Sequence, residues 1–394
     1  MRYLEILFWF CFIIVFYTYL GYGILLYLLV KIKELFIKPE QIKKSETDQF
    51  PEVTLFIAAF NEEAIVKEKM ENCRELYYPI EKLKIMWVTD GSNDKTNELL
   101  NAYPEVTVQY QLERQGKTAA LNRGMKFVTS PIVVFTDANT MINREAIREI
   151  VRKFTNPKVG CVAGEKRIVS KEKDAAAGGG EGIYWKYESA LKELDSRLYS
   201  AVGAAGELFA IRRELFETME KDTLLDDFIL SLRIAQKGYK ISYCKEAYAI
   251  ESASANMQEE EKRKVRIAAG GLQSIWRLRS LLNIFRYGSL SFQYISHRVL
   301  RWSITPILLF LMLPLNVLLK IKIQTEGYSL FLILQLMFYA AALWGYYLST
   351  RQIKNKLLFI PYYFLFMNIN VVKGFFYLKN KKNSGIWEKA KRSL

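Results

Sequence analysis

The feature that most constrains this chain is a run without any charged residue, from Ile6 to Val30. A helix of about 20 apolar residues is long enough to cross the roughly 30 Å hydrocarbon core of a bilayer. The apolar region of a cleaved signal peptide is shorter, about 7–15 residues, and ends at a small-residue cleavage site that this run lacks. The sequence therefore predicts a membrane anchor over residues 1–31.

Apolar runs of similar length return towards the other end of the chain. They predict a C-terminal membrane region over residues 301–380, followed by a basic tail over 381–394. Only the third run contains a charged residue, Lys373. The runs are Trp302–Leu319, Gly327–Thr350 and Leu357–Leu378.

Basic residues around the first run indicate the orientation of the chain. Arg2 is the only basic residue before it, whereas several lysines follow it closely. The positive-inside rule therefore predicts a multi-pass protein of the plasma membrane, with its middle part in the cytoplasm. Three full C-terminal crossings would put the basic tail outside, against the same rule. Either the last run is re-entrant or interfacial, or the tail departs from the rule. The lysines are Lys31, Lys33, Lys38, Lys43 and Lys44.

The charge balance narrows the choice of partners. A net charge of +15 fits nucleic acid, anionic lipid or a phosphate-bearing substrate. Nucleic acid is not expected, because no nucleic-acid-binding motif is present and the basic residues cluster at membrane edges. A transporter is disfavoured because the carboxylates lie outside the apolar runs. The four cysteines are scattered, and His297 is the only histidine, so no Cys or His metal cluster is expected.

The middle of the chain, residues 50–257, has the pattern of an α/β domain. Short apolar runs alternate with stretches of helical periodicity, which predicts a parallel, doubly wound sheet. In such sheets ligands bind outside the carboxyl ends of the strands. The expected strands are Val53–Phe60, Lys84–Val88, Val106–Tyr110 and Ile132–Phe135.

Two acidic residues follow expected strands closely, Asp90 and Asp137. Because the carboxyl ends of parallel strands share one edge of the sheet, both carboxylates are expected in the same crevice. There they are suited to hold a nucleotide sugar and a divalent cation. The alternative for each residue alone is a helix cap or a turn, where Asp is common.

Several motifs between residues 57 and 139 resemble, in type and in order along the chain, those of family 2 glycosyltransferases. The similarity is greatest to the membrane-bound branch that includes cellulose, hyaluronan and poly-N-acetylglucosamine synthases. The resemblance implies a GT-A (Rossmann-like) catalytic domain flanked by transmembrane helices. The motifs are Ile57–Glu63, Asp90–Asp94, Arg114–Asn122 and Asp137–Asn139, and the features extend over residues 50 to 302.

The resemblance assigns a donor site for a UDP-sugar. Asp90 would contact the uracil and ribose, and Lys117 the nucleotide or its phosphates, with an exposed solubilising role as the alternative for Lys117. Asp137 and Asn139 stand where the family has its metal-binding Asp-x-Asp, and would hold Mg²⁺ or Mn²⁺ with one negative charge fewer. The residues implied at the donor are Ala58, Asn61, Glu62, Asp90, Lys117, Asp137 and Arg263.

The same resemblance assigns the catalytic base. Asp226 and Asp227 precede a helical stretch, and Asp227 would take the proton of the acceptor hydroxyl, with Asp226 as its neighbour. Arg266 would stabilise charge on the departing diphosphate. The alternative for the two acids is an acidic first turn that complements the helix dipole.

Some segments depart from the pattern of processive relatives. Where these carry Gln-x-x-Arg-Trp, this chain has Arg263 and Ile267, so the Trp that stacks on the growing chain is missing. Trp276 or Trp185 is the expected substitute.

The Gly-rich run from Asp174 to Gly182 is expected to be a mobile lid or a surface linker. Residues 258–300 are expected to form amphipathic interface helices, with an ordinary core helix as the alternative.

The expected function is an inverting sugar transfer at the membrane. The donor is a UDP-sugar, and the acceptor is a growing extracellular or cell-surface polysaccharide. The alternative is a single transfer onto a lipid carrier, such as polyprenyl phosphate or a glycolipid. Membrane lipids are expected partners, and the resemblance leaves room for an accessory subunit.

Overall fold

The computed structural model describes residues 2–37, 50–169, 175–252, 254–323, 326–351, 353 and 355–380. The predicted basic tail and three of the lysines used for orientation, Lys38, Lys43 and Lys44, lie outside these residues. So does Asp174, the first residue of the Gly-rich run.

The domain in the middle of the chain is built on one mixed sheet of eight strands in the order β3-β2-β1-β4-β7-β6-β8-β5. The first four strands along the chain run parallel, as predicted. The prediction of a parallel sheet was wrong for the other half, because β7 is antiparallel to both β4 and β6. The strands are β1 (Val53–Ala59), β2 (Leu83–Asp90), β3 (Val106–Gln111), β4 (Ile132–Asp137), β5 (Met141–Ile142), β6 (Val159–Val169), β7 (Leu208–Arg212) and β8 (Lys240–Ser252).

Apolar side chains on the two faces of the sheet form two cores. One face of β1 presents Leu55 and Ile57 to α3, and the other presents Phe56 to α5. This two-sided burial explains why β1, β2 and β4 read as continuous apolar runs rather than alternating ones. The helices of the domain are α3 (Val66–Arg74), α4 (Thr96–Leu100), α5 (Lys117–Gly124), α6 (Ala146–Lys153), α7 (Ala175–Leu198) and α8 (Asp226–Gln236).

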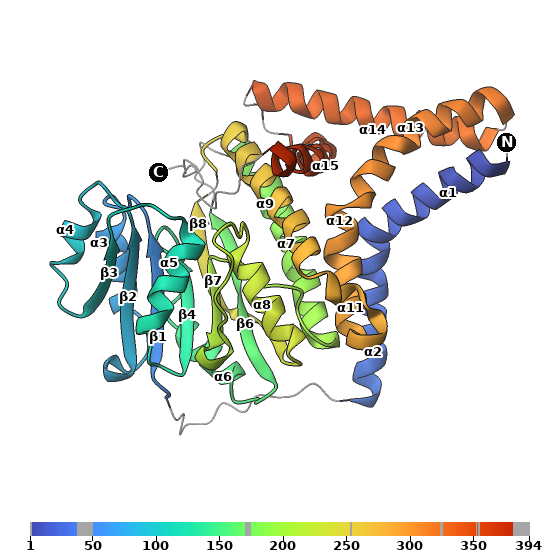
Figure 1. Ribbon diagram of the computed structural model, residues 1–394. Helices are drawn as coiled ribbons and strands as arrows, with labels where there is room; N and C mark the ends of the chain where they lie inside the picture. The colour runs from blue at the N-terminus through green and yellow to red at the C-terminus, as the bar shows by residue number, and fades with distance from the viewer. Residues whose placement is uncertain are drawn as a thin grey trace.

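Four segments in the described part of the chain are long and apolar enough to cross a membrane. They lie beside the sheet domain, at the right and top of Figure 1. The predicted α/β domain flanked by membrane-type helices is therefore confirmed. The segments are α1–α2 (Arg2–Phe36, with a π-helical turn at Tyr17–Gly21), α13 (Ile304–Ile323), α14 (Glu326–Thr350) and α15 (Lys356–Asn380).

The N-terminal segment is longer than one bilayer crossing requires. Its first half, α1 (Arg2–Phe16), packs along α13, whereas α2 (Tyr22–Phe36) packs against α7 of the sheet domain. At the end of α2, Lys33 donates to the carbonyls of Arg197 and Leu198 at 2.7 Å each. This segment therefore combines a half that packs with the membrane-type helices and a half that holds the sheet domain.

The Gly-rich run has a different structure from the one predicted. Residues 175–182 are the first turns of α7, not a loop. Glycine in a helix interior costs about 1 kcal/mol relative to alanine. The helix nevertheless forms because its C-terminal half is held on both sides, by α2 and by the sheet.

The predicted interface segment is only partly exposed. Over residues 258–300 the structure has α9 (Met257–Arg277), followed by short turns and helices. Trp276 is exposed, but Leu278 and Leu281 pack into the core of the domain. Arg277 pairs with Asp222 at 2.7 Å, so its guanidinium is held by the sheet domain.

Candidate active site

The ends of β1 and β2 are joined by a set of side-chain hydrogen bonds. Asn61, in a left-handed conformation (φ 52°), accepts from the amide of Asn93 at 3.0 Å and donates to its side chain at 2.7 Å. The amide of Glu62 donates to the hydroxyl of Thr96 at 2.8 Å. Ala58 lies one strand position before the end of β1 and pairs with Asp137 of β4. The predicted donor residues Ala58, Asn61 and Glu62 therefore lie at one rim of the sheet.

Asp90, the last residue of β2, is almost fully buried. Its carboxylate accepts from the amide of Gln115 at 3.1 Å and from that of Gly116 at 2.6 Å. The next residue, Gly91 (φ 69°), lies so close to Arg114 that a Cβ would stand 2.6 Å from its backbone nitrogen. Asp90 thus fixes the loop that leads into α5, and its predicted contact with the donor base stays a prediction.

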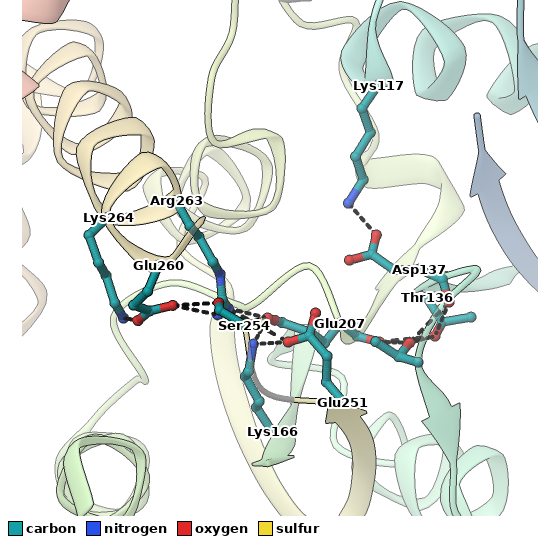
Figure 2. A network of polar contacts seen from close by, with 11 residues as sticks. Lys117, Thr136, Asp137, Lys166, Glu207, Glu251, Ser254, Glu260, Arg263 and Lys264 are labelled. Carbon is teal, nitrogen blue, oxygen red and sulfur yellow. Dashed lines mark hydrogen bonds and ion pairs between the residues drawn. The ribbon is translucent and has the colours of Figure 1, made fainter. Parts of the chain in front are cut away.

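The same loop carries Lys117 to the end of β4. Its Nζ lies 2.6 Å from Asp137 and 3.9 Å from Asp226. Although burial lowers it, these two carboxylates raise the pKa of Lys117 above its ordinary value. Three predicted residues from separate stretches of sequence are therefore brought together around one ammonium group, as Figure 2 shows for Lys117 and Asp137.

Asp226 and Asp227 form the first turn of α8. Burial, and then the charge of Asp226, raise the pKa of Asp227 to about 7, against the opposing effect of Lys117. A Cβ at Gly206 would stand 3.3 Å from Oδ2 of Asp227 and 3.1 Å from Nζ of Lys117. A carboxylate with a pKa near neutral pH beside a position that only glycine fills without crowding is suited to take a proton from a bound hydroxyl.

Asp137 and Asn139, the residues predicted to hold a divalent cation, suit an ion whose other ligands come from the substrate. The described part of the chain contains no group of three or more His, Cys, Asp or Glu side chains that could hold a metal alone. Asp137 is partly exposed, with a carboxylate at the rim, and Asn139 lies in the same turn. Mg²⁺ is commonly bound by one or two carboxylates together with substrate phosphates, which matches this donor set.

Lys69 supports the candidate site and was not identified by the sequence analysis. It is completely buried in α3, and its Nζ donates to the carbonyl of Thr140 at 2.5 Å and to the hydroxyl of Thr136 at 3.3 Å. These two residues flank the turn that carries Asp137 and Asn139. Burial lowers the pKa of Lys69 to about 8. No periodicity marks such a lysine, because its partners lie about 70 residues further along the chain.

Arg263 is held in a buried network of ion pairs that Figure 2 shows. Its guanidinium lies 3.4 Å from Glu207 and 3.6 Å from Glu251, and both carboxylates also contact Lys166. Although burial opposes them, Lys166 and Arg263 hold the pKa of Glu207 below its ordinary range. The network continues from Arg263 to Glu260. Arg263 thus braces the site from α9, and its predicted contact with the donor is untested.

The other predicted residues of α9 and the candidate stacking tryptophans are also placed. Arg266 is half-buried, one turn beyond Arg263. Ile267 packs against the core of the domain. Trp276 lies on the exposed surface, whereas Trp185 of α7 lies beside the network, with Nζ of Lys166 5.0 Å from its ring centre. Of the two expected substitutes, Trp185 is therefore the one near the site.

Comparisons with known proteins agree with this geometry. Residues 54–219 match the family described as Glycosyl transferase family 2. The poly-beta-1,6-N-acetyl-D-glucosamine synthase of Staphylococcus aureus (strain COL) is 27% identical over 239 residues, which are 58% of this chain and 57% of that protein. The probable glycosyltransferase YdaM of Bacillus subtilis (strain 168) is 25% identical over 244 residues, 56% of each chain. The matches thus span little more than half of these relatives.

The whole architecture also has a counterpart among solved structures. The mannosyltransferase PcManGT from Pyrobaculum calidifontis, in complex with GDP-Man and Mn²⁺, superposes with a TM-score of 0.72 at 21% identity. The superposition covers 95% of this chain and 99% of that one. At this identity the likeness concerns the fold. It confirms the predicted GT-A arrangement with its flanking helices.

Proposed function

We propose that this chain, whose residues 54–219 match the family described as Glycosyl transferase family 2, catalyses an inverting transfer of a sugar from a UDP-sugar to a saccharide hydroxyl at the membrane. The observation that carries the proposal is that Lys117 lies 2.6 Å from Asp137, while Gly206 stands against both Lys117 and Asp227. The residues that we propose to bind phosphate, to hold a metal and to act as the base therefore lie close together.

The reaction follows from these positions. The acceptor oxygen forms a bond to the anomeric carbon while the bond from that carbon to the donor phosphate breaks, and its electron pair leaves with UDP. Asp227 accepts the hydroxyl proton. One direct displacement inverts the anomeric centre. Lys117 places a positive charge where the diphosphate develops negative charge.

A divalent cation belongs to the proposal. Asp137 and Asn139 would hold Mg²⁺ or Mn²⁺ against the donor diphosphate. When bound, the cation would supply further neutralisation of the leaving group. The structural counterpart PcManGT was solved with Mn²⁺.

Two acceptors are open to such an enzyme. The name of the Staphylococcus aureus relative, a poly-beta-1,6-N-acetyl-D-glucosamine synthase, favours a growing polysaccharide. Ile267, which stands where processive relatives have a stacking Trp, favours a single transfer onto a lipid-linked acceptor.

The test is UDP release by the full-length protein in nanodiscs against a panel of UDP-sugars, with GDP-mannose as the comparison donor. Turnover of one UDP-sugar, dependent on Mg²⁺ or Mn²⁺, is the expected result. Turnover of GDP-mannose alone would contradict the choice of nucleotide. No turnover of any nucleotide sugar with either class of acceptor would contradict the proposed function.

A further inference from the structure

Helix α7 carries a polar stripe that faces the interior between the sheet domain and the membrane helices. Residues three and four apart share one face of a helix. One such stripe is apolar and packs against α2. The other is polar and buried or half-buried. The apolar stripe is Tyr187, Leu191, Leu194 and Leu198, and the polar stripe is Trp185, Glu188, Lys192 and Asp195.

Both acids of the polar stripe have partners from the membrane-proximal helices. The carboxylate of Asp195 lies 2.6 Å from Nδ1 of His297, which is fully buried. Glu188 lies 3.1 Å from Arg301 and also contacts Arg298. Both buried carboxylates of this stripe therefore have polar partners within the protein, as a low-dielectric interior requires.

Lys192 is different. Its residue is only 5% exposed, yet it forms no hydrogen bond and no ion pair with any residue in the described part of the chain. The charges that act on it are those of Glu188, Glu207 and Asp227, together with that of Arg298. A buried ammonium without a partner is costly, and a bound anion removes that cost.

Trp185 lies two helical turns before Lys192, on the same face of α7. Its ring centre is 5.7 Å from Nζ of Lys192, and 5.8 Å from Nζ of Lys264. Lys264 has its own carboxylate, Glu260, at 3.2 Å. The ammonium of Lys192, which has no ion pair in the described part of the chain, is therefore suited to bind an anionic group of a ligand. The ring of Trp185 is suited to pack against a sugar with its flat apolar face.

We propose that Trp185 and Lys192 form an acceptor subsite for a short, phosphate-bearing saccharide, with the sugar against Trp185 and the phosphate at Lys192. This inference rests on the proposed function and specifies its acceptor. The ring centre of Trp185 lies 5.0 Å from Nζ of Lys166, which pairs with Glu207, the residue after Gly206 at the proposed base. Because α7 also contacts α2 and α15, an acceptor held in lipid would be near this subsite. A saccharide linked to a polyprenyl lipid through diphosphate has this chemistry. Lys192 binds and takes no part in the proton transfer.

The test compares two acceptors that carry the same sugar, a polyprenyl diphosphate monosaccharide and a neutral alkyl glycoside. Full-length protein in phosphatidylcholine nanodiscs is used, wild type and Lys192→Met. A charge-assisted contact contributes about 1.5–3 kcal/mol, which is about tenfold or more in affinity. We expect the wild type to prefer the phosphorylated acceptor by at least about tenfold in KM, and Lys192→Met to lose that preference with an unchanged KM for the donor.

A matched control is Lys186→Met, on the exposed face of the same helix, which should change neither KM. A wild type that prefers the neutral acceptor, or a Lys192→Met variant that raises the KM of the donor instead, would overturn the subsite. If thermal unfolding shows that Lys192→Met does not fold, the test rests on whether the wild type prefers the phosphorylated acceptor to the neutral one.

Binding of the phosphorylated probe without any donor, followed by native mass spectrometry, separates this inference from the proposed function. Tenfold weaker binding by Lys192→Met supports the subsite even if no donor is turned over. Equal binding by both proteins overturns it. Displacement of the probe by added phosphatidylglycerol would assign the site to a lipid headgroup, which also overturns it.

Discussion

The charge of Asp226 should set the acidic limb of the pH–rate profile, although Asp226 is not itself the base. Asp227 can accept a proton only when it is deprotonated, so activity is lost as pH falls through its pKa of about 7. The neighbouring charge of Asp226 disfavours the deprotonated form of Asp227. Replacing it by the neutral amide, Asp226→Asn, should therefore lower the pKa of Asp227 and move the acidic limb to lower pH.

The size of the shift follows from the causes. The pKa of Asp227 rises from 3.8 to about 7, with burial as the largest cause and Asp226 as the second. Burial and the charge of Glu207 remain in the variant, so only part of the rise is lost. We expect a shift of about one pH unit, as is usual for a single neighbouring charge. At pH 6 the deprotonated fraction would then increase from about one tenth to about one half.

The assay is kcat/KM for the donor between pH 5 and 9, normalised to the plateau of each protein. Normalisation removes any loss of rate that does not depend on pH. Asp222→Asn is the matched control, because Asp222 pairs with Arg277 and is not among the charges that shift Asp227. An acidic limb that stays in place in Asp226→Asn, or moves to higher pH, would refute the reasoning.

Further substitutions test the surroundings of the base. Asp137→Ala should raise the Mn²⁺ concentration for half-maximal activity by about tenfold or more, and an unchanged metal dependence would contradict the metal assignment. Lys69→Met should reduce the free energy of unfolding by about 1–3 kcal/mol, because a buried carbonyl loses its donor, and should raise the KM of the donor. Gly206→Ala should lower kcat by about tenfold at an unchanged melting temperature, because its methyl group would crowd Lys117 and Asp227. A normal kcat in Gly206→Ala, or a normal KM in Lys69→Met, would show that these contacts do not matter for transfer.

The positions of the site residues at the carboxyl ends of the parallel strands were predictable from the sequence. Asp90 and Asp137 end strands whose apolar runs are unbroken, and parallel strands bring their carboxyl ends to one edge. Asp227 was also predictable, as part of an acidic pair at a helix start. The position of Asp90 against backbone amides was not, because these belong to a loop 25 residues away.

The parts that could not be predicted depend on distant partners. The Gly-rich start of α7 has poor helix propensity, and packing further along the helix overrides it. The ion pairs of Arg263 with Glu207 and Glu251 were not predictable, because the two acids come from other strands and loops. The antiparallel insertion of β7 follows from pairing across the sheet, which no local pattern records.

The measurement that tests the central claim most directly is a comparison of wild type and Asp227→Asn, with donor binding and transfer measured on the same preparation. Asp227→Asn should bind UDP with the affinity of the wild type, within about twofold, and should transfer sugar at least about a hundredfold more slowly. The wild-type product should have the inverted anomeric configuration by NMR. A variant that still transfers at a normal rate, or a product with retained configuration, would contradict the account.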